Sequence, residues 1–452
     1  MRDIVIFGII FGLVPLMIKR PAIGALVFMW ISLMNPHRLT YGPAYDFPFA
    51  MMVAVITIGA ILFSREPRDY PATPVTVLLI LFMVWITITT LFAISPPWLV
   101  NAEWSRVIKT LLMVAVTIMV VQSEADFKKM VWILVISLGL FGAKGGLFTL
   151  LTGGSYRVLG PAGSYIAENN SLALALVMAV PIIWYMRLQA QKRWLRYGLT
   201  AMAGFSVIAA AGSYSRGALL AGAAMMGFLW LKSRNKVSTG VVLLMLIPLV
   251  WLAMPEQWHA RMSTIDEYQT DGSALGRINA WYFAMQVAKS HFMGGGFMVF
   301  NPAMFRIYAP NPTDFHAAHS IFFQVLGEHG YVGLVLFVAI IGTAWRTANK
   351  IIKSVRTRPD LKWASDFAAM AQVSLIGYMV GGAFLSLAYF DLFYDIVILM
   401  VALEKVLLLR KGAALPGASA AADAQGRPRQ GTETRAAAAG PCPAATPPET
   451  IK

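Results

Sequence analysis

Long stretches without a single charged residue constrain this chain more than any other feature of its sequence. Residues 73–93 and 238–254 are apolar runs of this kind. The hydrocarbon core of a bilayer is about 30 Å thick, which a helix of about 20 apolar residues crosses. Helices satisfy their own backbone hydrogen bonds, whereas lipid offers the backbone no partner. The runs therefore predict transmembrane helices.

Composition supports a membrane protein and excludes several soluble classes. Of the 452 residues, 58% are hydrophobic and 13% charged, whereas a soluble domain carries about 25% charged residues. The net charge of +15 would indicate a nucleic-acid partner in a soluble protein. Here the basic residues fall in short loops between apolar runs, so we expect no nucleic acid. The one cysteine, Cys442, excludes a disulfide framework and a cysteine-based metal site.

Apolar segments predict an all-α integral membrane protein with about 12 transmembrane helices. The first segment lacks a small-residue cleavage signal, so we expect it to be retained. The first two segments are short for full spans, which leaves the side of the N-terminus open. The thirteen candidate segments lie near 3–18, 21–34, 48–63, 75–93, 107–121, 130–151, 170–186, 197–213, 217–231, 239–254, 331–347, 366–388 and 392–409.

Basic loops predict the orientation of the chain. Residues 187–196, 232–236 and 346–362 are rich in Lys and Arg, and such loops stay in the cytoplasm. Alternation then places residues 152–168, the turn at 212–216 and the large loop outside, in the periplasm of a bacterial inner membrane. The predicted organisation is N-terminal transmembrane helices in 1–254, a large periplasmic loop with short interfacial helices in 255–330, C-terminal transmembrane helices in 331–411 and a disordered cytoplasmic tail in 412–452.

Two arginines at the predicted outer face are candidates for binding an anion. Arg216 follows Gly212-Ser213-Tyr214-Ser215 at a turn that opens a helix, and a helix N-terminus with an arginine attracts anions. A solvated arginine at the interface is the alternative. Arg277 in the large loop could complete an anion clamp, although an ordinary surface arginine is the simpler reading in isolation. Arg157 is a third and weaker candidate.

Histidines in the large loop supply a candidate base. His316 and His319 precede a predicted helix that contains Glu328. A histidine at this place could act as a general base, or it could simply cap the helix. Zinc binding by the pair lacks a third ligand at a recognisable spacing.

Polar residues in two neighbouring spans are further candidates. Lys144 interrupts an apolar span, and an ionisable residue there is a functional candidate by default, with snorkelling as the alternative. Asn169 and Asn170 open the next span, where helix capping is the simpler reading.

The motifs, taken in order, resemble the O-antigen ligase/polymerase superfamily of bacterial membrane glycosyltransferases. The resemblance covers about residues 75–408, with Ser320 where the family usually has asparagine. Two further stretches resemble a subgroup of O-glycosylation ligases associated with exosortase systems. The superfamily stretches are Ser213-x-Ser215-Arg216-Gly217, Gly276-Arg277 with Trp281, and the block from His319-Ser320 through Glu328 and Gly330 to Gly333-Leu334. The subgroup stretches are Asn35-Pro36-His37-Arg38-Leu39 and Lys144-Gly145-Gly146 with Gly160-Pro161 and Glu168-Asn169-Asn170.

The resemblance implies a GT-C-type enzyme that moves a glycan from undecaprenyl pyrophosphate to a hydroxyl acceptor. The acceptor would be lipid A-core in a ligase, another glycan repeat in a polymerase, or protein in an O-oligosaccharyltransferase. Transfer would invert the anomeric carbon and need no metal, cofactor or nucleotide. A polysaccharide or lipid transporter is the rival from another class, but its polar groups usually gather near the midplane. The implied roles are general base for His319, pyrophosphate binding for Arg216, Arg277, Arg157 and Lys144, and support by His316, Glu328 and Asn170.

Overall fold

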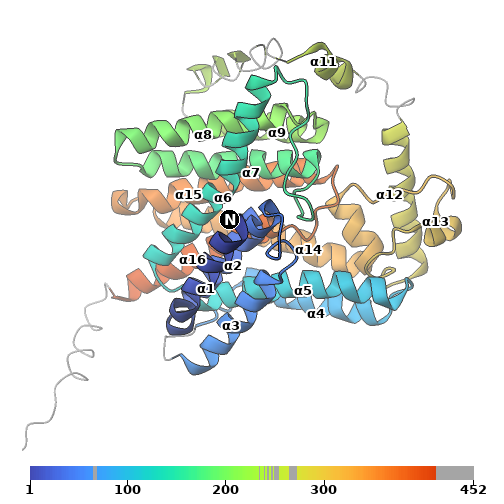
Figure 1. Ribbon diagram of the computed structural model, residues 1–452, viewed down its shortest axis with the longest axis horizontal. Coiled ribbons are helices and arrows are strands. Elements are labelled where there is room, and N and C mark those ends of the chain that lie inside the picture. The colour runs from blue at the N-terminus through green and yellow to red at the C-terminus, as the bar shows by residue number, and fades with distance from the viewer. Residues whose placement is uncertain are drawn as a thin grey trace, which may run out of the picture. The chain divides into compact units, whose positions relative to one another are not determined.

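The computed structural model describes residues 1–64, 69–233, 235–238, 240–241, 244–245, 248, 254–263 and 272–413. In these ranges every regular element is a helix and no strand occurs, so the predicted all-α class is confirmed. Residues Met1–Val406 form one compact unit, and Leu407–Lys452 form a second. Figure 1 shows the helices, which are α1 (Arg2–Lys19), α2 (Pro21–Met34), η1 (Pro36–Leu39), α3 (Phe49–Phe63), α4 (Pro74–Leu91), α5 (Pro97–Val120), α6 (Glu124–Leu151), α7 (Asn169–Gln189), α8 (Arg193–Ala211), α9 (Arg216–Lys232), α11 (Glu256–Ser263), α12 (Gly272–Ser290), α13 (Pro302–Tyr308), α14 (Ile321–Ser354), η2 (Pro359–Leu361), α15 (Lys362–Gly382) and α16 (Asp391–Ala413).

Among the residues that the structure describes, four helices are long and apolar enough to cross a membrane, which supports a membrane protein. They are α4, α6, α7 and α14, and α2 and α3 are shorter apolar helices. The count of about 12 spans and the division into four regions stay predictions. The predicted span 239–254 lies largely outside the described residues, and so does the predicted tail 412–452 apart from its first two residues.

Helix starts follow local sequence signals. Thr73 accepts a hydrogen bond from the backbone of Thr76, whose hydroxyl in turn accepts from the Thr73 backbone, and Pro74 occupies the first helical position of α4. This reciprocal capping satisfies N–H groups that have no partner inside the helix. Ser123 caps α6 and Ser215 caps α9 in the simpler way, through one side-chain oxygen.

Close helix packing fixes the C-terminal ends of α6 and α8. A Cβ atom at Gly146 would lie 2.3 Å from the backbone oxygen of Phe205, so only glycine allows this approach. Gly142 and Gly139, one and two turns earlier, face Ser206 and Met202 in the same way. Small residues at this spacing let membrane helices come close without a hydrophobic driving force. The packing sets the position of the loops that follow both helices.

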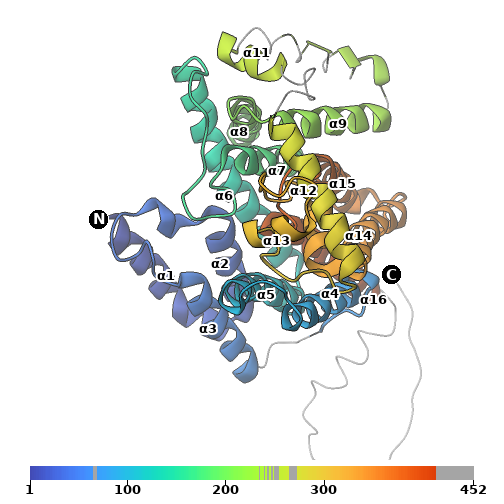
Figure 2. The ribbon, with the colours of Figure 1, turned by 90° about the vertical axis from the view of Figure 1, so that its right-hand side faces the viewer.

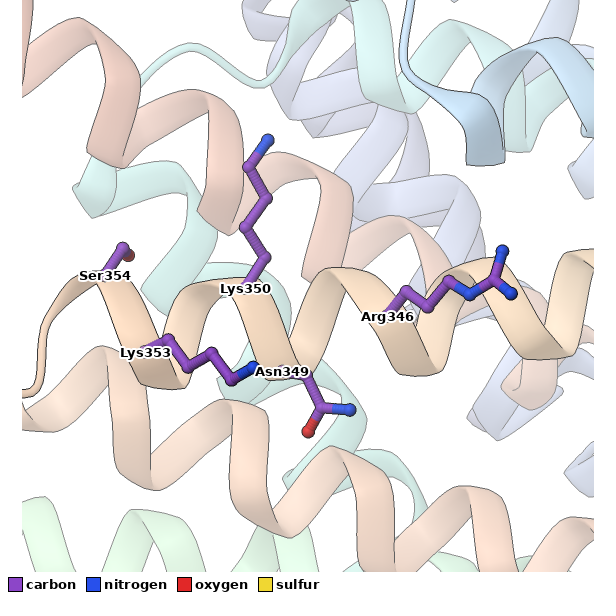
Figure 3. A pocket seen from close by; sticks show the side chains of 5 residues that line it. All are labelled: Arg346, Asn349, Lys350, Lys353 and Ser354. Atoms are coloured by element: carbon purple, nitrogen blue, oxygen red, sulfur yellow. The ribbon is translucent and has the colours of Figure 1, made fainter.

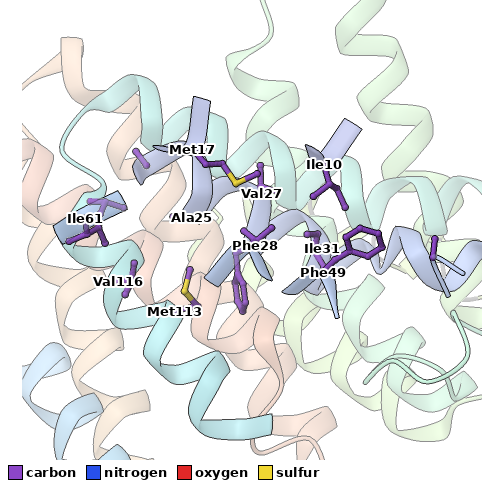
Figure 4. Packing of buried hydrophobic residues seen from close by; sticks show 14 residues of the cluster. Ile10, Met17, Ala25, Val27, Phe28, Ile31, Phe49, Ile61, Met113 and Val116 are labelled. Carbon is purple, nitrogen blue, oxygen red and sulfur yellow. The ribbon is translucent and has the colours of Figure 1, made fainter. Parts of the chain in front are cut away.

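The N-terminal helices share a separate apolar core. Figure 4 shows Ile10 and Met17 of α1 packed with Phe28 of α2, Phe49 of α3 and Met113 of α5. These side chains are buried, with at most 8% exposed. The core holds α1, α2 and α3 against α5, whose first turn follows the loop at residues 92–96.

The longest helix, α14, is interrupted at Gly330. Its backbone there has φ 65° and ψ −168°, which is not helical. A Cβ atom at this position would lie 2.3 Å from the backbone oxygen of Phe292. Glycine alone tolerates both the conformation and the contact.

Three donors from outside α14 satisfy carbonyl groups next to this interruption. The donors come from α4 and from the segment after α12, so the break is filled by protein. This segment also leads from α12 back to α14, which lie side by side in Figure 2. The bonds are Gly295 N to Gly327 O at 2.8 Å, Gly296 N to Glu328 O at 2.8 Å, and Trp85 Nε1 to His329 O at 2.9 Å.

Candidate functional site

The segment that precedes α14 is held against α12 by side chains of that helix. The Asn279 amide donates to the backbone oxygens of Asn311 at 2.9 Å and Asp314 at 2.8 Å, and its own oxygen accepts from Asn311 N at 2.9 Å. Two residues further on, the Trp281 indole donates to Ala318 O at 2.9 Å. Residues 311–318 are therefore fixed along α12 by hydrogen bonds at both ends.

This attachment brings Arg277 and Gly276 to the two histidines. A Cβ atom at Gly276 would lie 2.4 Å from the ring of His316, so the ring packs directly on the α12 backbone. The His316 ring also contacts the Asp314 carboxylate, at 2.8 Å between Nε2 and Oδ1. Arg277 lies close enough to His319 for its charge to act on that ring.

The environment of His319 keeps its ring neutral. The pKa of His319 is lowered to about 4, mainly because the ring is buried and to a smaller extent because of the positive charges of Arg277 and His316. A neutral imidazole can accept a proton at physiological pH. The shift has its main cause in desolvation, which disfavours the charged form.

The backbone of His319 takes an uncommon conformation that another segment stabilises. Its φ is +42°, in the left-handed region. The His319 N–H donates to the Ser386 hydroxyl at 2.8 Å. Gln324, in the first turn of α14, accepts from the Ala388 backbone N–H at 3.1 Å. The connection between α15 and α16, residues 383–390, thus fixes both His319 and the start of α14.

The first turn of α9 packs against the end of α15 and the same connection. A Cβ atom at Gly217 would lie 3.5 Å from Phe384 Cβ. Gly217 directly follows Arg216, the first residue of α9, so the connection 383–390 joins the surroundings of Arg216 to His319. The Arg216 side chain is half-buried. Arg277, His316 and His319 are therefore held together, and the helix that begins at Arg216 approaches the same connection.

The turn itself is built from hydrogen bonds to its neighbours. Asn169, at the start of α7, donates its amide to Ser213 O at 2.7 Å. Tyr214, with φ +61°, donates its hydroxyl to Gly154 O at 2.6 Å. The Ser215 hydroxyl accepts from Ala218 N at 3.2 Å. These bonds orient the first turn of α9 and its N–H groups.

Residues 201–338 match the family described as O-antigen ligase. This match supports the O-antigen ligase superfamily. It also supports a membrane enzyme of the glycosyltransferase type. Residues 1–191 match a family of unknown function, DUF5935. No curated protein matches the chain.

The region matched by the O-antigen ligase family contains five of the predicted site residues, namely Arg216, Arg277, His316, His319 and Glu328. Glu328 is buried in α14, where the Tyr389 hydroxyl donates to its carboxylate at 2.6 Å. Tyr389 belongs to the connection 383–390 that also fixes His319. Glu328 lies about two turns into α14, and its hydrogen bond links this helix to the connection 383–390. Its supporting role stays a prediction.

The three remaining predicted residues fall in the region matched by the family of unknown function. Arg157 is exposed on the loop after α6, with its charge close enough to act on Tyr214. Asn170 is half-buried in the first turn of α7, beside the Asn169 that bonds the Arg216 turn. Lys144 is exposed on α6, two turns before that helix ends. Arg157 and Asn170 border the turn, whereas Lys144 points away from the α6–α8 packing.

The two subgroup stretches meet in space. A Cβ atom at Gly163, which has φ +73°, would lie 3.4 Å from the guanidinium carbon of Arg38. Arg38 also stacks over Tyr45 at 4.6 Å and pairs with Asp46 at 3.2 Å. The η1 segment thus packs against the loop that carries Arg157.

Sequence reasoning missed the connection 383–390. Its one signal was Ser386, a polar residue inside the predicted span 366–388. Sequence reasoning also gave Asn279 no role, although it stands two residues after Arg277. In the described part of the chain, no group of three or more His, Cys, Asp or Glu side chains is placed to hold a metal ion. The expectation of metal-independent transfer is open to direct test.

Proposed function

We propose that this protein transfers a glycan from undecaprenyl pyrophosphate to lipid A-core at the periplasmic face of the bacterial inner membrane, with inversion and without a metal ion. The observation that carries the proposal is that α12 and the connection 383–390 hold Arg277 near His319, while the same connection approaches the helix that begins at Arg216. The match to the O-antigen ligase family supports a lipid-linked glycan donor and an acceptor.

The arginines would stabilise the leaving group. The bond between the anomeric carbon and the phosphate oxygen breaks, and its electron pair stays on the pyrophosphate. Fixed cations and N–H groups aimed at that oxygen stabilise the developing charge. Arg277 and Arg216, the latter at a helix N-terminus, supply both kinds of group.

The histidine would take the proton of the acceptor hydroxyl. Its hydroxyl oxygen attacks the anomeric carbon, a new carbon–oxygen bond forms, and the hydroxyl proton passes to the His319 ring. General-base assistance of this kind is typically worth about 10²–10⁴-fold. Bound pyrophosphate would offset the positive charge of Arg277, which raises the pKa of His319 and makes it a stronger base when the donor is in place.

Two related activities share this chemistry, namely polymerisation of glycan repeats and O-glycosylation of protein. They differ in the acceptor alone. A transporter would also account for one observation, the interruption of α14, because many transporters contain broken helices. In this chain, however, donors from Gly295, Gly296 and Trp85 occupy the carbonyls next to the break, so they are not available to coordinate cargo.

Transfer by the purified, reconstituted protein tests the proposal. The substrates are an undecaprenyl-pyrophosphate glycan and lipid A-core, with EDTA present. We expect transfer by the wild type and its loss in His319→Ala, Arg216→Ala and Arg277→Ala, each checked for folding. Lys289→Ala, a cation in the last turn of α12, is the matched control and should retain activity.

Each other outcome has a defined meaning. Donor consumed into longer glycans or onto protein would keep the site and replace the acceptor. Transfer that EDTA abolishes would overturn the metal-independent mechanism. Absence of donor consumption under all conditions, with folded protein, would overturn the enzyme assignment in favour of transport.

A further inference from the structure

An open cavity of about 580 Å³ lies at the C-terminal end of α14, far from the site described above. Figure 3 shows its lining, which comes from this helix alone: Arg346, Asn349, Lys350, Lys353 and Ser354. These positions recur at intervals of three and four residues, so they occupy one face of the helix. The lining contains three cations and no carboxylate.

Most of this positive charge is not neutralised by the protein. Lys350 pairs with Glu404 of α16 at 2.6 Å. In the part of the chain that the structure describes, no ion pair involves Arg346 or Lys353. Asn349 is held in place by an amide hydrogen bond from Gln372 of α15 at 3.0 Å. The cavity therefore presents two unneutralised cations beside a fixed amide.

An exposed apolar track leads along α14 to these cations. Val335 and Val338 have 66% and 46% of their surface exposed, inside a helix long and apolar enough to span a membrane. Between them and Arg346 lies Gly342, where an added Cβ would meet nothing within 4 Å. The spacing of three and four residues places this track on the same side of the helix as Arg346.

The cavity and the glycan-transfer site lie at opposite ends of α14. The part of α14 after the interruption at Gly330 runs to Arg346 over 16 residues, which is about 24 Å at 1.5 Å per helical residue. The basic residues of 346–362 indicate that this end of the helix lies at the headgroups of the cytoplasmic leaflet.

We propose that this cavity binds the phosphodiester headgroup of an anionic phospholipid, with one acyl chain along Val335, Val338 and Gly342. The Arg346 guanidinium can bind phosphate oxygens through two parallel N–H donors, and Lys353 adds a second charge. Basic pockets at the cytoplasmic ends of membrane helices attract anionic headgroups in this way. The apolar track distinguishes a lipid from free phosphate, which would gain nothing from it. The proposal is independent of the glycan chemistry.

Native mass spectrometry of the full-length protein in neutral detergent tests this site. Dioleoylphosphatidylglycerol is titrated against dioleoylphosphatidylcholine, and inorganic phosphate and glycerol 3-phosphate are added as competitors. We expect the double variant Arg346→Gln with Lys353→Gln to bind phosphatidylglycerol about 30-fold more weakly, from about 1 kcal/mol for each basic residue. Arg346→Lys with Lys353→Arg should largely retain binding.

The matched control is Lys192→Gln with Arg193→Gln, which removes two exposed cations between α7 and α8. It should leave phosphatidylglycerol binding within about twofold of the wild type, since both changes lie outside the cavity. An equal loss in this control would show non-specific attraction and overturn the site. Displacement of the lipid by millimolar inorganic phosphate would overturn the lipid identity. Unchanged binding in the cavity variant, with an unchanged thermal unfolding temperature, would overturn the proposal altogether.

Discussion

The left-handed backbone of His319 is a costly conformation for a residue with a side chain, of the order of 1–3 kcal/mol. Its N–H bond to Ser386 compensates for part of this cost and fixes the direction in which the ring leaves the backbone. Ser386 contacts the backbone of the proposed base and is a positioning residue.

Replacement of Ser386 should therefore affect turnover more than substrate binding. We expect Ser386→Ala to lower kcat about 10-fold, the equivalent of about 1.4 kcal/mol, with KM for the donor nearly unchanged. Ser386→Thr keeps the hydroxyl and should restore most of the rate. Steady-state kinetics of the three proteins provide the measurement. A purely structural role would instead lower the unfolding temperature and leave kcat per folded molecule intact.

The pH dependence of transfer should report the charge of Arg277. Protonation removes the base, so activity is lost as pH falls through the pKa of His319. In the free enzyme this pKa is about 4, and kcat/KM for the donor should hold down to that pH. In the donor complex the pyrophosphate offsets Arg277, so the acid limb of kcat should lie at higher pH.

Arg277→Gln separates the two effects. It should move the acid limb of kcat/KM upward from pH 4 towards the ordinary histidine value of about 6.5, while the rate falls about 10²–10³-fold through lost charge stabilisation. A pH–rate profile from pH 3.5 to 9 supplies the test. An acid limb that stays in place would show that burial alone sets the pKa.

At the scale of helices, α14 joins two segments that were predicted as separate. Residues 331–347 were predicted as a span and the helix that contains Glu328 as part of the large loop 255–330, yet both belong to one element, Ile321–Ser354, interrupted at Gly330. The donors that fill the interruption come from Trp85, Gly295 and Gly296, which are distant in sequence. Local periodicity contains no information about them, so the break could not be predicted.

Two glycines of α14 provide a matched pair of substitutions. Gly330→Ala forces a side chain into a positive φ and against Phe292 O, and should lower the free energy of unfolding by about 3 kcal/mol or more. Gly342→Ala lies in open space in a regular helix, and should be neutral or raise it by up to about 1 kcal/mol. Thermal unfolding in detergent distinguishes them. Equal stability of the two variants would contradict the structure at the break.

Across the whole molecule, short motifs drew attention to candidate site residues and not to the residues that hold them in place. Arg216, Arg277 and His319 stood out because their side chains can bind an anion or accept a proton, and their roles stay predictions. Asn279 and Ser386 did not, since an isolated polar residue has many ordinary uses and its partner lies up to 67 residues away. The side of the membrane on which this site lies was predicted from basic loops alone.

That orientation can be tested on intact cells by cysteine labelling. Cys442 is the chain's one cysteine, so Cys442→Ser gives a background without thiols. Thr313→Cys places an exposed thiol near the histidines, and Ser354→Cys places one at the basic end of α14. A membrane-impermeant maleimide should label Thr313→Cys in spheroplasts and Ser354→Cys only after lysis, because basic loops remain in the cytoplasm. The reverse pattern would place the glycan-transfer site in the cytoplasm, where a periplasmic acceptor could not reach it.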